Sequence, residues 1–256
     1  MKISKAMLLV AGAMAFASSA AVAGITDPGL IIEASNANGS GTYQVFLSNG
    51  SWSKNTAGHD VWRWTSPAEG YDIFDDNFNV IAHVGLMQCE MVSDPQVTVN
   101  FSVNATALAT NFAITTGVLS FPSGIASGAM GRATAGVTIT DNDGDGATLN
   151  GGFGGFGYRA NYNGTIPSGS VFSTLLNGPL VAAADDSATL SQSTGGYPGY
   201  QAIGGAVNSM QAKFNFQLSP NDTASGTSFY EIIPSPASAV LLAGAGLVGA
   251  ARRRRA

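Results

Sequence analysis

Apolar and polar residues alternate along much of the chain, which is the pattern of a half-buried β-strand. In the segment 95–106, PQVTVNFSVNAT, the apolar residues stand at 97, 99, 101 and 103, and polar residues stand between them. This period of two places Val97, Val99, Phe101 and Val103 on one face of a strand. The same alternation recurs in 42–48 (TYQVFLS), 111–121 (NFAITTGVLSF), 136–140 (GVTIT) and 213–219 (KFNFQLS).

Turn-forming clusters such as NGSG, DNDGDG and SPND separate these short segments. The segment 79–91, NVIAHVGLMQCEM, is apolar enough to form either a buried strand or a short helix. No repeat with a period of 20 to 50 residues is present, which argues against a propeller or solenoid. The pattern predicts an all-β fold: a single antiparallel β-sandwich of Greek-key or jelly-roll type over residues 24–233.

The first 23 residues have the layout of a secretory signal peptide. Lys2 and Lys5 precede an apolar stretch, and the small residues Ala21 and Ala23 follow it at the spacing that signal peptidase reads. We therefore expect cleavage before Gly24 and export across the inner membrane.

The last 23 residues, 234–256, have the opposite layout. Pro234, Ser235 and Pro236 precede an apolar run over 237–251. The run ends in four cations, Arg252, Arg253, Arg254 and Arg255. Fifteen helical residues span about 22 Å, less than the roughly 30 Å of a hydrocarbon core. The run therefore predicts a short membrane helix, a transient or permanent anchor with its arginines in the cytoplasm.

This proline pair, apolar run and arginine cluster resemble the PEP-CTERM sorting signal of bacterial surface proteins. In the family's usual motif the middle residue is glutamate, whereas Ser235 occupies that position here. The resemblance implies that an exosortase-like membrane protease removes the tail and passes the protein to the cell surface or exterior. It also implies an association with exopolysaccharide and biofilm material.

Charge bears on the partners of the folded part. The two ends hold six of the eleven Lys and Arg residues and none of the sixteen acids, so the body between them carries a net charge of −11. Such a body repels nucleic acid and anionic surfaces and is compatible with divalent cations. With Cys89 as the single cysteine, no intramolecular disulfide can form.

The segment 141–146, DNDGDG, matches the start of a calcium loop. Asp141, Asp143 and Asp145 occupy the ligand positions 1, 3 and 5, but position 12 is Gly152 rather than glutamate. A calcium ion would therefore need another carboxylate, for which Asp185 and Asp186 are candidates. The alternative is a polar turn without any cofactor.

Aromatic residues are dense between Trp52 and Phe78. Trp62 and Trp64 share a face if VWRW is a strand, and exposed flat rings could stack on sugars. Packing in the core is the commoner fate of large aromatic residues and is the favoured interpretation.

Motifs for catalysis are absent from the sequence. The histidines are His59 and His83, and there is no nucleophile elbow or zinc motif. A pair of Cys89 with His83 is conceivable, although a buried, inert thiol is the favoured interpretation. We therefore expect a non-enzymatic exported surface or matrix protein. The alternative is a calcium-assisted or aromatic-faced glycan-binding module, and the third hypothesis is a secreted glycoside hydrolase with carboxylate chemistry.

Overall fold

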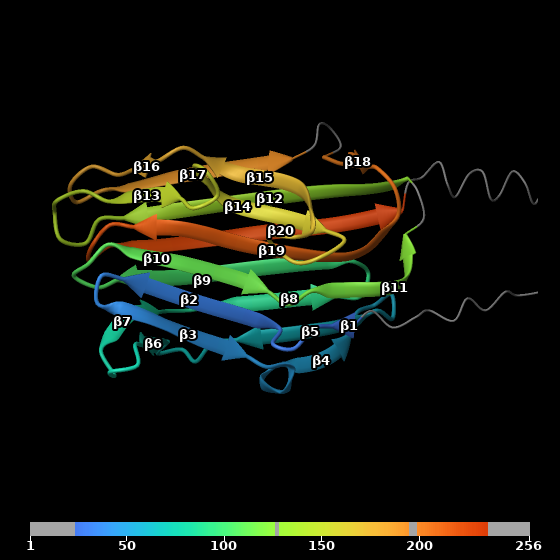
Figure 1. Cartoon of the computed structure of the whole chain (residues 1–256), viewed down its shortest axis with the longest axis horizontal. Helices are drawn as coiled ribbons and strands as arrows, with labels where there is room; N and C mark the ends of the chain where they lie inside the picture. The colour runs from blue at the N-terminus through green and yellow to red at the C-terminus, as the bar shows by residue number, and fades with distance from the viewer. Residues whose placement is uncertain (1–23, 126–127, 195–198, 235–256) are drawn as a thin grey trace, which may run out of the picture.

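Two antiparallel β-sheets pack face to face in the computed structural model, which describes residues 24–125, 128–194 and 199–234 (Figure 1). Every strand pairing among these residues is antiparallel, and the only helix among them is the short 3₁₀ turn η1 (Leu47–Asn49). The prediction of an all-β sandwich is confirmed. The narrower prediction of a Greek-key or jelly-roll order stays a prediction.

The first sheet has the central order β1-β11-β19-β10-β2-β3, with β13 and β14 also paired to β19. Its strands are β1 (Gly24–Ile25), β2 (Leu30–Asn36), β3 (Gly39–Val45), β10 (Thr110–Thr116), β11 (Leu119–Ile125), β13 (Thr148–Gly151), β14 (Phe156–Tyr162), β15 (Ser170–Asn177), β16 (Leu180–Val181) and β19 (Val207–Leu218).

The second sheet has the central order β17-β12-β20-β9-β8-β5-β4, with β18 paired to β12 and the β6–β7 hairpin joined to β9. Its strands are β4 (Ser51–Lys54), β5 (Asp60–Thr65), β6 (Tyr71–Phe74), β7 (Val80–Val84), β8 (Gln88–Val92), β9 (Gln96–Ala105), β12 (Ala129–Thr140), β17 (Ser187–Thr194), β18 (Gln201–Ile203) and β20 (Thr223–Pro234).

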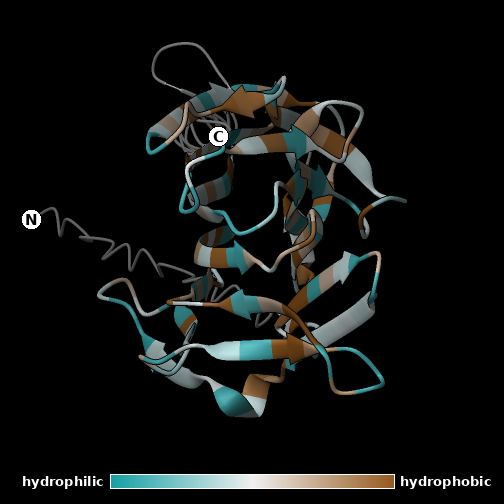
Figure 2. Ribbon diagram, turned by 90° about the vertical axis from the view of Figure 1, so that its left-hand side faces the viewer, coloured by the Kyte–Doolittle hydropathy of each residue, from teal (hydrophilic) through white to brown (hydrophobic). Residues whose placement is uncertain are grey.

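The alternation read from the sequence separates core from surface in the long strands. Apolar positions of β9, β12, β19 and β20 face the space between the sheets, and the residues between them face outward. Figure 2 shows hydrophobic and hydrophilic positions alternating along single strands. Aromatic rings fill the centre of the core: Phe101 of the second sheet contacts Phe214 and Phe216 of the first, with ring centroids 4.8 and 5.8 Å apart.

Two segments that read as continuous in the sequence are divided in the structure. Segment 79–91 forms β7 and β8, because β9 pairs with β8 along its first half and with β7 along its second. Segment 111–121 is divided between β10 and β11 at Gly117. A Cβ atom on Gly117 would lie 2.7 Å from the carbonyl oxygen of Thr26, so only glycine fits this close approach.

The predicted export signals fall mostly outside the described residues. Ala21, Ala23, Ser235, Pro236 and the four C-terminal arginines lie there, whereas Pro234 is the last residue of β20. In the ranges that the structure describes, no helix is long and apolar enough to cross a membrane.

Tyr230 of β20 provides a test of core packing. Its ring is buried and stacks on Phe172 at 5.4 Å between centroids, while its hydroxyl group bonds to no described residue. A buried hydroxyl without a partner costs free energy, so Tyr230→Phe should leave the free energy of unfolding unchanged or raise it by up to about 1 kcal/mol. Tyr230→Ala should lower it by about 3–5 kcal/mol. Urea denaturation measures the free energy of unfolding of both variants. A large decrease in Tyr230→Phe would contradict the finding that the Tyr230 hydroxyl group has no hydrogen-bond partner among the described residues.

Candidate functional site

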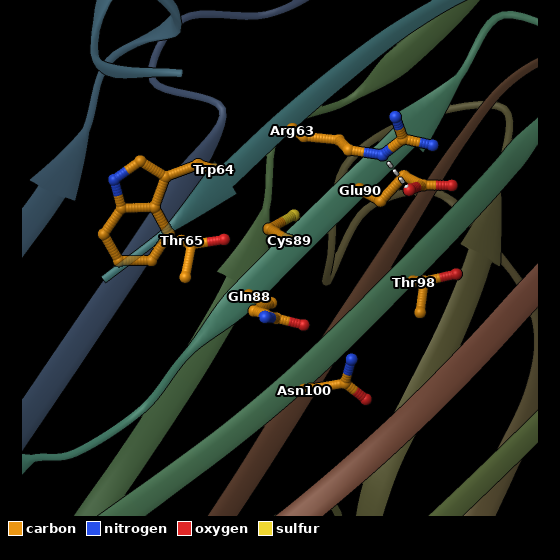
Figure 3. Close-up of a pocket in the computed structure, with 8 residues that line it drawn as sticks. All are labelled: Arg63, Trp64, Thr65, Gln88, Cys89, Glu90, Thr98 and Asn100. Atoms are coloured by element: carbon orange, nitrogen blue, oxygen red, sulfur yellow. Dashed lines mark hydrogen bonds and ion pairs between the residues drawn. The ribbon is translucent and has the colours of Figure 1, made fainter. Parts of the chain in front are cut away.

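A shallow hollow of about 250 Å³ lies in the outer face of the second sheet, across β5, β8 and β9 (Figure 3). We call it the first hollow. Trp64 and Cys89 are buried and alternate with the outward residues, so their backbone forms the floor. The side chains at its rim are polar: Arg63, Thr65, Gln88, Glu90, Thr98 and Asn100.

A second hollow of about 390 Å³ continues from Asn100 across β20, β12 and β17. Its floor lies at Gly136, which faces outward and has no side chain to fill it, and at the backbone of Gly226, which faces the core. The outward residues around it carry hydroxyl groups: Thr138, Thr189, Ser191, Ser225 and Thr227. Phe101 and Val137 also line the second hollow, which meets the first at Asn100, and the two hollows together are called the trough below.

Strand register aligns one row of outward residues along the trough. The row is Thr65, Gln88, Asn100, Thr227, Gly136 and Ser191, each opposite the next on the neighbouring strand. Six strands at about 4.8 Å between neighbours give a row of about 24 Å. The trough is therefore long and shallow, which suits an extended ligand better than a compact one.

The trough has little net charge, although the body of the chain is strongly acidic. Arg63 Nε donates a hydrogen bond to Glu90 Oε2 at 2.5 Å, and this pair supplies both charges of the first hollow (Figure 3). Both side chains are partly exposed, so the pair adds only about 0–1 kcal/mol to stability. Its remaining nitrogen and oxygen atoms can therefore serve a ligand.

The structure corrects the suggestion that Trp62 and Trp64 contact a glycan. Trp62 is 0% exposed and Trp64 is 7% exposed, so both belong to the core, as the favoured interpretation held. Trp62 Nε1 donates to the carbonyl oxygen of Leu47 at 3.0 Å, which satisfies its polar atom. Trp52 is the exposed tryptophan, opposite Trp62 on the edge strand β4.

The predicted calcium loop joins β12 to β13, at the end of the sandwich opposite Gly24 and Pro234 (Figure 1). Asp141 and Asp143 converge there with Asp222, and their carboxylate oxygens lie within 4.8 Å of one another. Asp145 is not one of the three converging residues. Asp222 comes from the turn before β20, and the pairing of Thr140 with Thr223 brings it beside Asp141.

Hydrogen bonds fix two of these carboxylates. Asp141 accepts backbone N–H groups from Gly144 at 3.1 Å and from Asp185 at 2.5 Å. Asp222 is fully buried and accepts bonds from the Ser219 hydroxyl and from the Asn142 N–H. Asp185 was predicted as a further carboxylate ligand. In the structure it contacts Asp141 through its backbone N–H group.

Mutual repulsion shapes the titration of the cluster. The charge of Asp143 raises the pKa of Asp145, and burial raises the pKa of Asp222. The Asp185 N–H has the opposite effect and lowers the pKa of Asp141. Among the described residues, none of these four aspartates forms an ion pair with Lys, Arg or His.

The histidines and the cysteine do not assemble into a catalytic pair. His83 Nδ1 lies 2.9 Å from Asp72 Oδ1 on the outer face, whereas Cys89 is buried in the core, where burial raises the pKa of its thiol. His59 Nδ1 lies 3.5 Å from Asp94 Oδ2, and the neighbouring Asp60 forms an ion pair with Lys54 at 2.7 Å.

Comparison with known proteins adds little to this description. No family model and no curated protein matches the chain. Among solved structures, one described as "CBM4 structure and function" is 13% identical, with a TM-score of 0.23 over 71% of this chain and 92% of that chain. The C-terminal CBM6 of LamC from Zobellia galactanivorans is 7% identical, with a TM-score of 0.17 over 71% and 87%. A CBM29-2 mutant complexed with cellulohexaose is 10% identical, with a TM-score of 0.19 over 73% and 94%. The function proposed below therefore rests on the geometry of this chain.

The opposite pKa shifts of Asp145 and Asp141 predict opposite mutational effects. Because the pKa of Asp145 is raised on folding, its ionisation costs stability once the pH exceeds that pKa, and Asp145→Asn should be more stable than the wild type at about pH 7. This advantage should shrink as the pH falls to about 4. Asp141→Asn should be less stable at about pH 7, because the ionised form is the one that its backbone donors hold.

Urea midpoints at both pH values measure these effects. Equal midpoints for the wild type and both variants at about pH 7 would show that the repulsion and the backbone bonds have no energetic consequence.

Calcium binding stays a prediction, and the cluster defines its test. An ion held by Asp141, Asp143 and Asp222 would neutralise their repulsion and stabilise the fold. Calcium at about 100 times its dissociation constant should add about 2.7 kcal/mol. Thermal melting with calcium or with chelator measures this, with Asp143→Asn as the variant that should lose the response. An unchanged melting temperature in millimolar calcium would contradict the prediction.

Proposed function

We propose that the trough on the second sheet binds a neutral polysaccharide outside the cell. The trough offers amide and hydroxyl groups in a row of about 24 Å. Each of these groups both donates and accepts hydrogen bonds, as the hydroxyl groups of a sugar do. The net negative charge of the surrounding body disfavours a polyanionic ligand.

Gly136 is the observation that carries this proposal. It sits in the middle of β12, where glycine is unfavourable by roughly 0.5–1 kcal/mol. The fold does not require glycine there: a Cβ atom would meet Ser191 Oγ at 3.6 Å, an ordinary contact, and the backbone φ is not positive. Gly226 differs, because its Cβ would lie 2.5 Å from the ring of Phe101. Packing therefore does not explain why position 136 is a glycine. The missing side chain leaves the second hollow open.

Binding without hydrolysis fits the lining of the first hollow. A glycoside hydrolase uses two carboxylates on either side of the scissile bond. Glu90 is the single carboxylate among the residues that line the first hollow, and Arg63 already pairs with it. The proposal is therefore for a binding module and not for an enzyme.

The export signals of the sequence complete the proposal. Signal peptidase would remove residues 1–23, and an exosortase-like protease would process the tail, residues 234–256. The folded part would then act at the cell surface or in the extracellular matrix. Its partner there would be the exopolysaccharide of the producing bacterium.

The test uses variants of the trough in native gels cast with the neutral fraction of that exopolysaccharide. Gly136→Thr should fill the second hollow and weaken binding about tenfold, while raising the free energy of unfolding by roughly 0.5–1 kcal/mol. Thr98→Ala and Asn100→Ala should weaken binding by up to about tenfold each, the value of one hydrogen bond. Gel retardation gives the affinities, and urea denaturation gives the stabilities.

Thr56→Ala is the matched control, because it removes an exposed hydroxyl group in the loop before β5. It should bind as the wild type does. Wild-type retardation of Gly136→Thr, or stronger retardation by the acidic polysaccharide fraction than by the neutral one, would refute the proposal.

A further inference from the structure

The outer face of the first sheet, on the opposite side of the sandwich, has a hollow of its own. This opposite hollow lies across β2, β3, β10 and β19, with Ala113 in its floor. The outward side chains around it are Glu33, Ser35, Ser40, Thr42, Asn111 and Asn215.

Strand register again arranges the polar groups in rows. One row contains Asn215, Ala113, Glu33 and Thr42, and the next contains Gln217, Asn111, Ser35 and Ser40. Gln217 Nε2 donates to Asn111 Oδ1 at 3.3 Å, so neighbouring side chains hold one another in place. The small side chain of Ala113 leaves the hollow open, as Gly136 does on the other face.

One acid–base pair lies beside the opposite hollow and one beside the first hollow: Lys213 with Glu33 at 3.7 Å, and Arg63 with Glu90. Lys213 belongs to a third row, in which it lies opposite Arg159, and the Arg159 guanidinium lies 4.4 Å from the centre of the Phe153 ring.

A ligand on one face cannot be the same stretch of chain as a ligand on the other. The sheets pack about 10 Å apart, and the side chains of the core fill the space between them. The two faces point in opposite directions from that core. Two occupied faces would therefore hold two chain segments on either side of the protein.

We infer that the protein binds polysaccharide on both outer faces and so cross-links separate chains. The inference rests on the proposed function, because it gives the opposite hollow the same class of ligand. A two-sided binder needs no second copy of itself to join chains, and its affinity for a dense matrix gains from having two sites.

The experiment separates binding from cross-linking. The opposite-face variant is Thr42→Ala with Asn111→Ala, and the trough variant is Thr98→Ala with Asn100→Ala. Each is mixed with the neutral exopolysaccharide fraction, and gel retardation and solution viscosity are recorded. Sedimentation of each protein alone gives its mass, and thermal melting checks its fold.

We expect the wild type to raise viscosity and each single-face variant to be retarded but to lose most of that rise. The variant with both faces altered should lose retardation as well. A full rise in viscosity with the opposite-face variant would overturn the inference and leave the proposed function standing. Loss of all retardation in the opposite-face variant alone, with the trough variant normal, would overturn the proposed function and the inference together.

A change of oligomeric state is the remaining outcome. If the wild type sediments as a dimer and the opposite-face variant as a monomer, the face is a contact between copies, and the inference is wrong. A wild-type monomer that raises viscosity supports it.

Discussion

Twelve consecutive residue pairs join β12 to β20. The trough and the cluster of Asp141, Asp143 and Asp222 both depend on that register. The pairing sets Gly136 opposite Thr227 in the trough and, at its far end, Thr140 opposite Thr223. Asp141 and Asp222, the next residues outward, are thereby brought together. A slip of one residue would turn the core side of β20 to solvent and would separate both sets. The buried apolar side of these strands thus fixes where the polar groups lie.

The charged side chains of the folded part are unevenly distributed between one end of the sandwich and the two sheet faces. The aspartates of the β12–β13 loop and the turn before β20 gather at one end, where repulsion raises the pKa of Asp145. The hollows on the sheet faces, in contrast, are bordered mostly by hydroxyl and amide groups, with one acid–base pair beside the first hollow and one beside the opposite hollow. Because charges on exposed loops act weakly at distances beyond about 8–10 Å in physiological salt, the faces can recognise a neutral ligand despite the net charge.

Local pattern was enough to predict the buried side of the long strands but not which strands lie beside them. Alternation identified the buried side of β9 and of β19, because burial of every second residue is visible within one segment. Trp62 and Trp64 obey the same alternation, yet only the pairing with β8 shows that their side is the core. Asp222 and the trough row join residues more than a hundred positions apart in some cases, and nothing in the adjoining sequence encodes those pairings. The turn SPND gave no signal that its aspartate would meet Asp141.

Packing explains some of the glycines in the second sheet but not all of them. Gly226 and Gly131 face inward, and a Cβ atom on either would press on an aromatic ring, Phe101 or Phe172, so packing explains both. Gly136 faces outward, where a Cβ atom would make only ordinary contacts with Ser191 and Leu190, so packing does not explain it. A sequence shaped by stability alone would replace it, as it has placed threonine at 134 and 138 on the same face. Under the proposed function, glycine is kept at this position because a side chain there would fill part of the second hollow.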